Sequence, residues 1–292
     1  MTMKTEKFAV LILTHGRADN VVTIKTLRRC GYTGKIYLVI DDEDKQQERY
    51  KELYEDQVVV FEKEKYLRLT DTGDNGGNRG VVVAARNAAF DIARGLGLDY
   101  FVELDDDYDS FQIRYEADDK LKVKIIKDLD AVFDAYIEFL EATGALTVCF
   151  AQGGDFIGGK ESQNWRKRIG RKAMNAFFCK TDRPFEFFGR INEDLTMSTV
   201  YGNRGELIMT VSDVCLHQGT TQANAGGLTE AYVEFGTCLK SFYSVIFSPQ
   251  AVKVKTMGPS SRRIHHAVDW NLCAPMILSE KWRKVEDKEA KA

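Results

Sequence analysis

Short apolar runs alternate with amphipathic stretches over the first 110 residues. The run over residues 8–13 is almost wholly apolar and ends at a polar turn, which predicts a strand buried on both faces. Similar runs predict strands over residues 35–40, 58–61 and 100–104. Between the runs, apolar residues recur three and four positions apart, as in the helix expected over residues 82–96. This alternation predicts an α/β fold: a Rossmann-type, mainly parallel sheet flanked by helices.

The second part of the chain has a less regular pattern. A helix is expected from Asp128, an apolar strand over residues 146–151 and another strand over residues 208–216. The first apolar run is too short for a signal sequence or a membrane span. We therefore expect a cytoplasmic protein without a membrane partner. We also expect a single domain over residues 1–292.

Composition and charge narrow the classes of protein. Hydrophobic residues make up 44% of the 292 residues and charged residues 29%, which excludes disordered, collagenous and membrane classes. The net charge of -3 lacks the basic excess of many nucleic-acid binders, so a polyanion would need a local patch. The 6 cysteines form no CxxC pair, which indicates reduced, buried thiols.

The strongest local signal is an apolar strand that ends in three adjacent carboxylates, Asp105, Asp106 and Asp107. Six acids and no base fall within residues 99–109. Crowded carboxylates are costly unless a cation compensates them, and oxygen ligands suit Mg²⁺ or Mn²⁺. Asp105 and Asp107 are two residues apart, so in an extended chain their side chains point to the same side. They are therefore the better pair of metal ligands among the three acids. A solvated acidic turn is the alternative for an isolated DxD, but the density of acids favours a metal.

The segment from Arg79-Gly80 through Ala85-Arg86-Asn87 to Asp105–Asp107 resembles the signature of GT-A nucleotide-sugar glycosyltransferases. In those enzymes the DxD binds the metal that bridges the donor diphosphate. A dinucleotide-binding Rossmann site is disfavoured, because the turn over residues 14–17 lacks GxGxxG. The resemblance implies that residues 1–109 bind the nucleotide sugar and that residues 110–292 carry the acceptor site and the catalytic group.

Further motifs resemble the TET/JBP-associated glycosyltransferases, which are found mainly in bacteriophages. They are Leu13-Thr14-His15-Gly16-Arg17-Ala18-Asp19-Asn20, Asp41-Asp42-Glu43-Asp44, Gly73-Asp74-Asn75, Gln152-Gly153-Gly154 and His265-His266. The resemblance implies transfer of a sugar from a nucleotide sugar, expected to be a UDP-sugar, to 5-hydroxymethylpyrimidine in double-stranded DNA. The expected base is 5-hydroxymethylcytosine, and the site of action is the host cytoplasm if the protein is phage-encoded.

The resemblance also implies roles for individual residues. Donor contacts are expected from Thr14, His15, Gly16, Arg17, Asp41, Asp42, Asp74, Asn75, Arg86, Asp105 and Asp106. The alternative for the polar turns is that they cap helices and shape loops. A metal is expected on Asp105, Asp107 and His217, with His265 and His266 as competing candidates for the histidine.

The catalytic base is expected in the segment Asn192-Glu193-Asp194, which resembles the xED motif of GT-A enzymes. A carboxylate within hydrogen-bond reach of the acceptor hydroxyl removes its proton as the anomeric carbon is attacked. Asp194 is the predicted base, with Glu193 beside it. The alternative is that this segment only caps a helix, where acids are favoured by the helix dipole.

A basic segment over residues 160–172 is the expected DNA contact. It has six bases against one acid, and its predicted DNA-binding residues are Lys160, Trp165, Arg166, Lys167, Arg168, Arg171 and Lys172. Trp165 is expected to stack on a base or to wedge into the duplex. A solvated amphipathic helix is the alternative.

Two other functions stay open. The same machinery can act on a protein or small-molecule hydroxyl, or the chain can be a non-catalytic nucleotide- or DNA-binding module. The sequence indicates neither the sugar, nor the stereochemistry, nor an oligomeric state.

Overall fold

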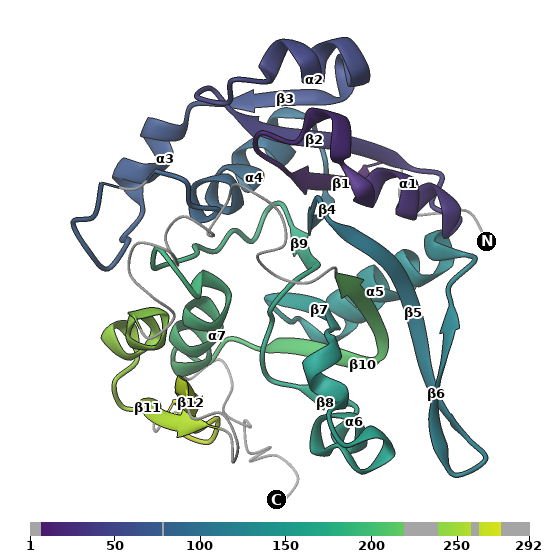
Figure 1. Ribbon diagram of the computed structural model, residues 1–292, viewed down its shortest axis with the longest axis vertical. Coiled ribbons are helices and arrows are strands. Elements are labelled where there is room, and N and C mark those ends of the chain that lie inside the picture. Colours follow the sequence, from purple (N-terminus) through teal and green to yellow (C-terminus); the bar gives the residue numbers. More distant parts are fainter. Residues whose placement is uncertain (1–6, 78, 219–238, 258–262, 276–292) are drawn as a thin grey trace, which may run out of the picture.

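The computed structural model describes residues 7–77, 79–218, 239–257 and 263–275 (Figure 1). Its first part alternates strands and helices as expected. The strands are β1 (Phe8–Leu13), β2 (Lys35–Asp41), β3 (Val58–Phe61) and β4 (Tyr100–Asp105). The helices are α1 (Val22–Arg29), α2 (Gln47–Tyr54), α3 (Lys63–Leu69) and α4 (Val83–Gly95).

The second part adds strands that pair mostly antiparallel, together with further helices, among them one over residues 239–247. The strands are β5 (Tyr108–Ala117), β6 (Lys120–Ile125), β7 (Thr147–Ala151), β8 (Ile169–Gly170), β9 (Phe177–Lys180) and β10 (Ile208–Gln218). The other helices are α5 (Leu129–Thr143), α6 (Gln163–Lys167) and α7 (Glu193–Asn203). A separate hairpin is formed by β11 (Val252–Met257) and β12 (Arg263–Val268).

One mixed sheet of 10 strands carries the fold. Its order is β3-β2-β1-β4-β9-β7-β10-β5-β6, with β8 paired to β10. The neighbours β3, β2, β1 and β4 are parallel, whereas β9 runs antiparallel to both β4 and β7. The predicted α/β class is confirmed, and the parallel arrangement is concentrated in the first 105 residues.

The core lies on both faces of this sheet, as the continuous apolar run of β1 predicts. Alternate residues of a strand point to opposite faces. Val10 and Ile12 pack with Leu27 of α1 and Phe133 of α5. Ala9 and Leu11 pack on the other face with buried residues of α4, namely Ala84, Ala88 and Ala89. The small alanines let α4 lie close to the sheet, which fixes the side chains that α4 presents at the carboxyl ends of the strands.

Five of the cysteines are buried and free: Cys30, Cys149, Cys179, Cys215 and Cys273. This agrees with the expected reduced thiols, while Cys238 lies outside the described residues. Within the described ranges, no helix has the length and hydrophobicity needed to cross a lipid bilayer.

Gly31 ends α1 in a conformation that favours glycine. Its φ is +87°, and an added Cβ would clash with the carbonyl oxygen of Lys127. Gly97 is a matched control, because its φ is +69° but an added Cβ meets nothing within 4 Å. We predict that Gly31→Ala lowers the free energy of unfolding by about 3 kcal/mol and Gly97→Ala by about 1 kcal/mol, as measured by urea denaturation. Equal losses for the two variants would contradict the proposed close contact at Lys127.

Candidate active site

The carboxyl ends of three parallel strands bring the sequence motifs together. β1 lies between β2 and β4, with Leu13 opposite both Val39 and Asp105. The turns that follow these strands therefore share one edge of the sheet. They contain residues 14–17, 41–44 and 105–107.

Asp106 is the inward-facing acid of the β4 turn. It is 5% exposed and accepts hydrogen bonds from Thr14 Oγ1 at 2.6 Å and from Arg17 Nη1 at 2.6 Å. Thr14 Oγ1 also lies 2.8 Å from the hydroxyl of Tyr50. Burial raises the pKa of Asp106, and the contacts with Thr14 and Arg17 oppose that rise. Both oxygens of Asp106 accept hydrogen bonds from the turn after β1, and the predicted donor contact by Asp106 stays a prediction.

Asp105 and Asp107 flank Asp106 and have different surroundings. Asp105 accepts hydrogen bonds from Arg86 Nη2 at 3.2 Å and from the Tyr108 hydroxyl at 3.0 Å. Asp107 Oδ2 accepts one from Gln218 Nε2 at 3.0 Å, and its Oδ1 is buried with no hydrogen-bond partner among the described residues. Burial raises the pKa of Asp107, and the charge of Asp105 adds to the rise. An unpartnered carboxylate oxygen beside a second carboxylate fits a hard divalent cation.

The predicted histidine ligand lies elsewhere at this edge. His217 Nδ1 is 2.8 Å from Asp109 Oδ1. Over the described ranges, no group of three or more His, Cys, Asp or Glu side chains is arranged to hold a metal. A metal on Asp105 and Asp107 would therefore have most of its coordination positions open to donor phosphate and water. The structure does not assemble His217 with these two acids, and its role as a ligand stays a prediction.

The competing histidines lie on the hairpin strand β12. His266 Nδ1 is 3.3 Å from Asn192 Nδ2, and the centroid of its ring lies 4.2 Å from that of His265, with the two rings tilted by 45°. Burial, followed by the neighbouring His265, lowers the pKa of His266 to about 4. His266 is therefore neutral at pH 7 and contacts the residue that precedes α7.

Arg86 of α4 joins three carboxylates in the interior. Its side chain is 4% exposed, and its Nε lies 3.1 Å from Glu193 Oε1. Nη1 lies 3.4 Å from Glu103 Oε2, and Nη2 is the donor to Asp105 described above. The rings of Phe177 and Phe187 lie 5.0 and 5.5 Å from the guanidinium carbon. Every guanidinium nitrogen of Arg86 faces a carboxylate inside the protein, and the predicted donor contact by Arg86 stays a prediction.

Burial and charge act in opposite directions on this cluster. Burial opposes the charged form of Arg86, but Asp105, Glu193 and Glu103 raise its pKa overall. Glu103 is wholly buried, and burial raises its pKa to about 8 despite the attraction of Arg86. Its contact with Arg86 is the longest of the three, so we assign the protonated carboxyl to Glu103. Arg86 then balances Asp105 and Glu193.

The first turn of α7 carries the predicted base. Asn192, at φ 59°, turns the chain into the helix, and Glu193 points to Arg86. Asp194 Oδ1 accepts a hydrogen bond from its neighbour, the Leu195 N–H, at 2.6 Å. Burial, followed by the charge of Glu193, raises the pKa of Asp194 to about 7. A carboxylate with a pKa near neutrality suits general base catalysis.

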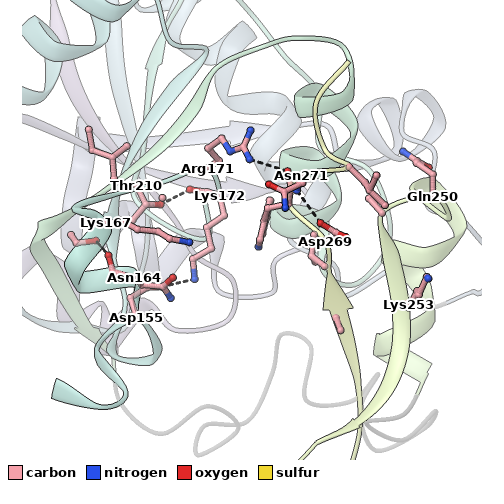
Figure 2. A pocket seen from close by; sticks show the side chains of 18 of the residues that line it. Asp155, Asn164, Lys167, Arg171, Lys172, Thr210, Gln250, Lys253, Asp269 and Asn271 are labelled. Carbon is pink, nitrogen blue, oxygen red and sulfur yellow. Dashed lines mark hydrogen bonds and ion pairs between the residues drawn. The ribbon is translucent and has the colours of Figure 1, made fainter. Parts of the chain in front are cut away.

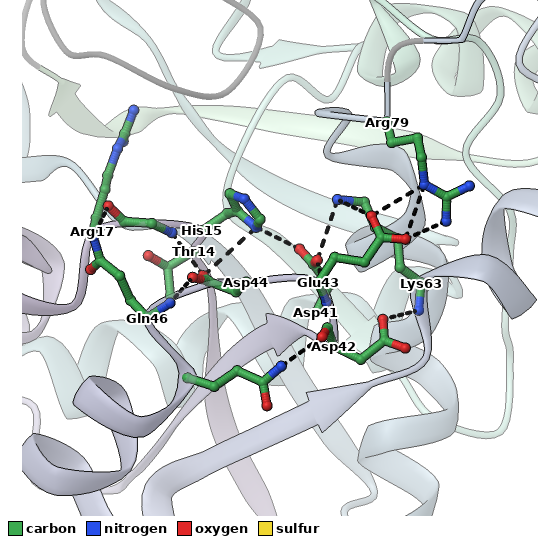
Figure 3. Close-up of polar contacts among 12 residues, drawn as sticks. Thr14, His15, Arg17, Asp41, Asp42, Glu43, Asp44, Gln46, Lys63 and Arg79 are labelled. Atoms are coloured by element: carbon green, nitrogen blue, oxygen red, sulfur yellow. Dashed lines mark hydrogen bonds and ion pairs between the residues drawn. The ribbon is translucent and has the colours of Figure 1, made fainter.

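A second polar cluster lies beyond β1 and β2 (Figure 3). His15 Nδ1 is 2.7 Å from Asp41 Oδ2, and the buried Lys63 Nζ is 3.3 Å from Asp41 Oδ1. The Gly16 N–H donates to Asp44 Oδ2 at 2.7 Å. The hydrogen bond to Asp41 raises the pKa of His15. Burial alone would raise the pKa of Asp41, but His15 and Lys63 lower it.

Two further predicted donor residues have structural contacts. Asp42 Oδ1 accepts a hydrogen bond from the Lys63 N–H at 2.9 Å, which fixes the first turn of α3. Asp74 accepts from Arg190 Nε at 2.8 Å and from the Tyr243 hydroxyl. Lys63, Arg190 and Tyr243 were not predicted from the sequence. Asn75, next to Asp74, is exposed.

The family profile described as TET-Associated Glycosyltransferase matches residues 8–227. The chain belongs to this family. The matched residues include both acidic turns, the start of α7 and the basic segment, whereas His265 and His266 lie beyond the match. No curated protein sequence matches the chain.

Solved glycosyltransferase structures resemble this TET-associated glycosyltransferase at low identity. S. aureus TarS 1–349 in complex with UDP is 15% identical, with a TM-score of 0.42 over 72% of this chain and 60% of that one. The chain thus spans less than two thirds of TarS 1–349. The mannosyltransferase PcManGT from Pyrobaculum calidifontis, in complex with GDP-Man and Mn²⁺, is 13% identical, with a TM-score of 0.44 over 75% and 58% of the chains. Glucosyl-3-phosphoglycerate synthase from Mycobacterium tuberculosis, in complex with Mg²⁺ and UDP, is 12% identical, with a TM-score of 0.42 over 91% and 89%.

The basic segment of this TET-associated glycosyltransferase contains one buried side chain, cations that pair with acids and cations that have no acidic partner among the described residues. Trp165 is 1% exposed, packs against Phe156 and lies 3.7 Å from the Arg168 guanidinium carbon. The prediction that Trp165 stacks on a nucleic-acid base is wrong, because the ring fills a small core cluster. Four predicted cations pair with acids, in the pairs Lys160–Asp119, Arg166–Glu161, Arg168–Asp213 and Lys172–Asp155. Lys167 and Arg171 are exposed and have no acidic partner in the described part of the chain.

The unpartnered oxygen of Asp107 gives a test of the metal site. We predict that Asp107→Asn weakens the Mn²⁺-dependent binding of UDP about 10–100-fold, because an amide is a poorer ligand for a hard cation. The measurement is calorimetric titration of UDP with and without Mn²⁺. Asp99→Asn is the matched control, since Asp99 is an exposed acid beside the amino end of the same strand and forms an ion pair with Lys7. Equal affinities for both variants would exclude Asp107 as a ligand.

Proposed function

We propose that this TET-associated glycosyltransferase transfers a sugar from a nucleotide sugar, with a UDP-sugar as the expected donor, to the hydroxyl of 5-hydroxymethylcytosine in double-stranded DNA. The observation that carries the proposal is the shared guanidinium of Arg86. It holds Asp105, of the predicted metal pair, and Glu193, the neighbour of the predicted base, on one side chain. Family membership supports the class of reaction and the DNA acceptor.

The donor end of the proposed site lies at the turns after β1 and β2. His15 is 45% exposed at its side chain, while Asp41 and Lys63 behind it are buried. An exposed imidazole backed by a buried ion pair suits contact with the nucleotide. Asp105 and Asp107 would hold the divalent metal, Mn²⁺ or Mg²⁺. When bound, the metal stabilises the negative charge on the departing diphosphate.

Asp194 supplies the base in this proposal. The acceptor hydroxyl oxygen forms a bond to the anomeric carbon, and its proton passes to the Asp194 carboxylate. The bond between the anomeric carbon and the diphosphate oxygen breaks, and the electron pair leaves with the nucleoside diphosphate. A single displacement of this kind inverts the anomeric centre.

The raised pKa of Asp194 predicts a pH dependence. Below a pKa of about 7 the carboxyl is protonated and cannot accept a proton, so kcat/KM should rise with pH through this value and level off above it. Asp194→Asn should lower the transfer rate about 10²–10⁴-fold and remove this limb from any residual activity. Retained Mn²⁺-dependent UDP binding by Asp194→Asn is the control. A flat wild-type profile from pH 6 to 8 would contradict the assignment.

The acceptor is tested by direct transfer. The protein is incubated with Mn²⁺, a panel of UDP-sugars and duplexes that contain either 5-hydroxymethylcytosine or cytosine, and the DNA is then digested to nucleosides. Mass spectrometry should show a hexose or pentose added only to 5-hydroxymethyl-2′-deoxycytidine. Hydrolysis of a UDP-sugar with no mass gain on any DNA would overturn the acceptor and indicate a protein or small-molecule hydroxyl instead.

A further inference from the structure

A groove of about 520 Å³ lies between the basic segment and the β11–β12 hairpin (Figure 2). One wall is formed by residues of α6, β8 and the chain that follows, including Lys167 and Arg171. The other wall is formed by the hairpin and its flanks, including Lys253 and Lys255. A hydrogen bond from Arg171 Nη2 to the Trp270 carbonyl oxygen, at 3.1 Å, joins the two walls.

The lining of the groove has an excess of positive charge. Its cations are Lys167, Arg171, Lys172, Lys253 and Lys255, and its acids are Asp155 and Asp269. Lys172 and Asp155 neutralise each other at 2.5 Å. The other four cations are exposed, and none has an acidic partner within the described ranges. The lining therefore has four cations and one acid that are not paired with each other, and an anionic partner would compensate this excess of positive charge.

The hairpin arranges its two lysines as a pair. Lys253 and Lys255 are two residues apart on β11, so they lie on one face of the strand, about 7 Å apart along it. They are far in sequence from Lys167 and Arg171, and only the fold brings the four together. A row of separated cations along two walls suits a regularly charged polymer better than a single small anion.

The segments that form both walls contact α7, the helix that carries Asp194. On the first wall, the Ala173 N–H donates to Ser198 Oγ at 3.0 Å, one turn beyond Asp194. On the second, His266 contacts Asn192, and an added Cβ on Gly202 would lie 2.7 Å from the Cys273 carbonyl oxygen. Figure 1 shows the hairpin beside α7. These contacts fix the position of the groove relative to Asp194, the proposed base.

We propose that this groove binds the phosphate backbone of the DNA acceptor through Lys167 and Arg171 on one wall and Lys253 and Lys255 on the other. The inference rests on the proposed function, and it adds the hairpin as a second contact surface that the basic segment alone does not provide. Phosphates bound here would fix the duplex relative to α7, and the target base would reach Asp194 from the groove.

The test is the salt dependence of DNA binding by Lys253→Ala/Lys255→Ala. Binding of a fluorescent 5-hydroxymethylcytosine duplex is measured by anisotropy between 50 and 200 mM salt. Loss of two phosphate contacts should weaken binding about tenfold or more and make the slope of log K against log salt shallower by about 2. Lys253→Arg/Lys255→Arg keeps the charge and should keep the affinity.

Lys25→Ala/Lys35→Ala is the matched control, because it removes two exposed lysines, one on α1 and one at the start of β2. Thermal unfolding checks that each variant is folded. Equal affinities and slopes for the hairpin variant and this control overturn the groove, as does a wild type that binds no duplex at 50 mM salt. Failure of the proposed function is seen separately, as the absence of added sugar on DNA that the wild type does bind.

Discussion

The buried guanidinium of Arg86 is the interaction on which the candidate site depends. It lies between α4, β4 and α7 and contacts Asp105, Glu103 and Glu193 within 3.4 Å. Breaking a buried ion pair typically costs about 3–5 kcal/mol, because the remaining charge has no partner. Without Arg86, three carboxyl groups would meet in the interior with no cation beside them. The relative position of the metal carboxylates and the base carboxylate is therefore set by one side chain.

The same charge balance explains the pKa shifts at the edge of the site. Arg86 compensates two carboxylates, and Arg17 compensates Asp106. Asp107 and Asp194 have no cation of their own at contact distance among the described residues, and burial raises the pKa of both. This surplus of acid suits a divalent cation at Asp107 and a proton-accepting group at Asp194. The near-neutral total charge is thus the sum of an acidic site and a separate basic groove.

The sequence predicted the elements whose signal is local. Continuous apolar runs were sufficient to predict β1, β2 and β4, because strands buried on both faces show no alternation of polar residues. Helical spacing of apolar residues was sufficient to predict α4. The antiparallel strands β5, β6 and β9 were not predicted. Residues of β5 and β6 are largely polar, and β9 is four residues long, so tertiary pairing rather than local pattern decides these strands.

The sequence predicted which residues belong to the site more successfully than it predicted the role of each residue. Arg86, Asp106 and Trp165 were identified as candidates, but the fold buries all three, and burial is not visible in a local motif. Lys63 and Arg190 were missed because their partners, Asp41 and Asp74, are 22 and 116 residues away. The lysines of β11 were missed because two bases in a short strand are not a basic cluster, and only the fold places them beside Lys167 and Arg171.

The most direct test is a crystal structure of the protein with UDP and Mn²⁺, with the metal located by anomalous scattering. We predict one manganese peak within bonding distance of Asp105 and Asp107, with Arg86 still contacting Asp105 and Glu193 and the Asp194 carboxylate facing the space beyond the UDP β-phosphate. A manganese peak at Asp109 and His217 alone, or a UDP bound away from the turns after β1 and β4, would contradict it.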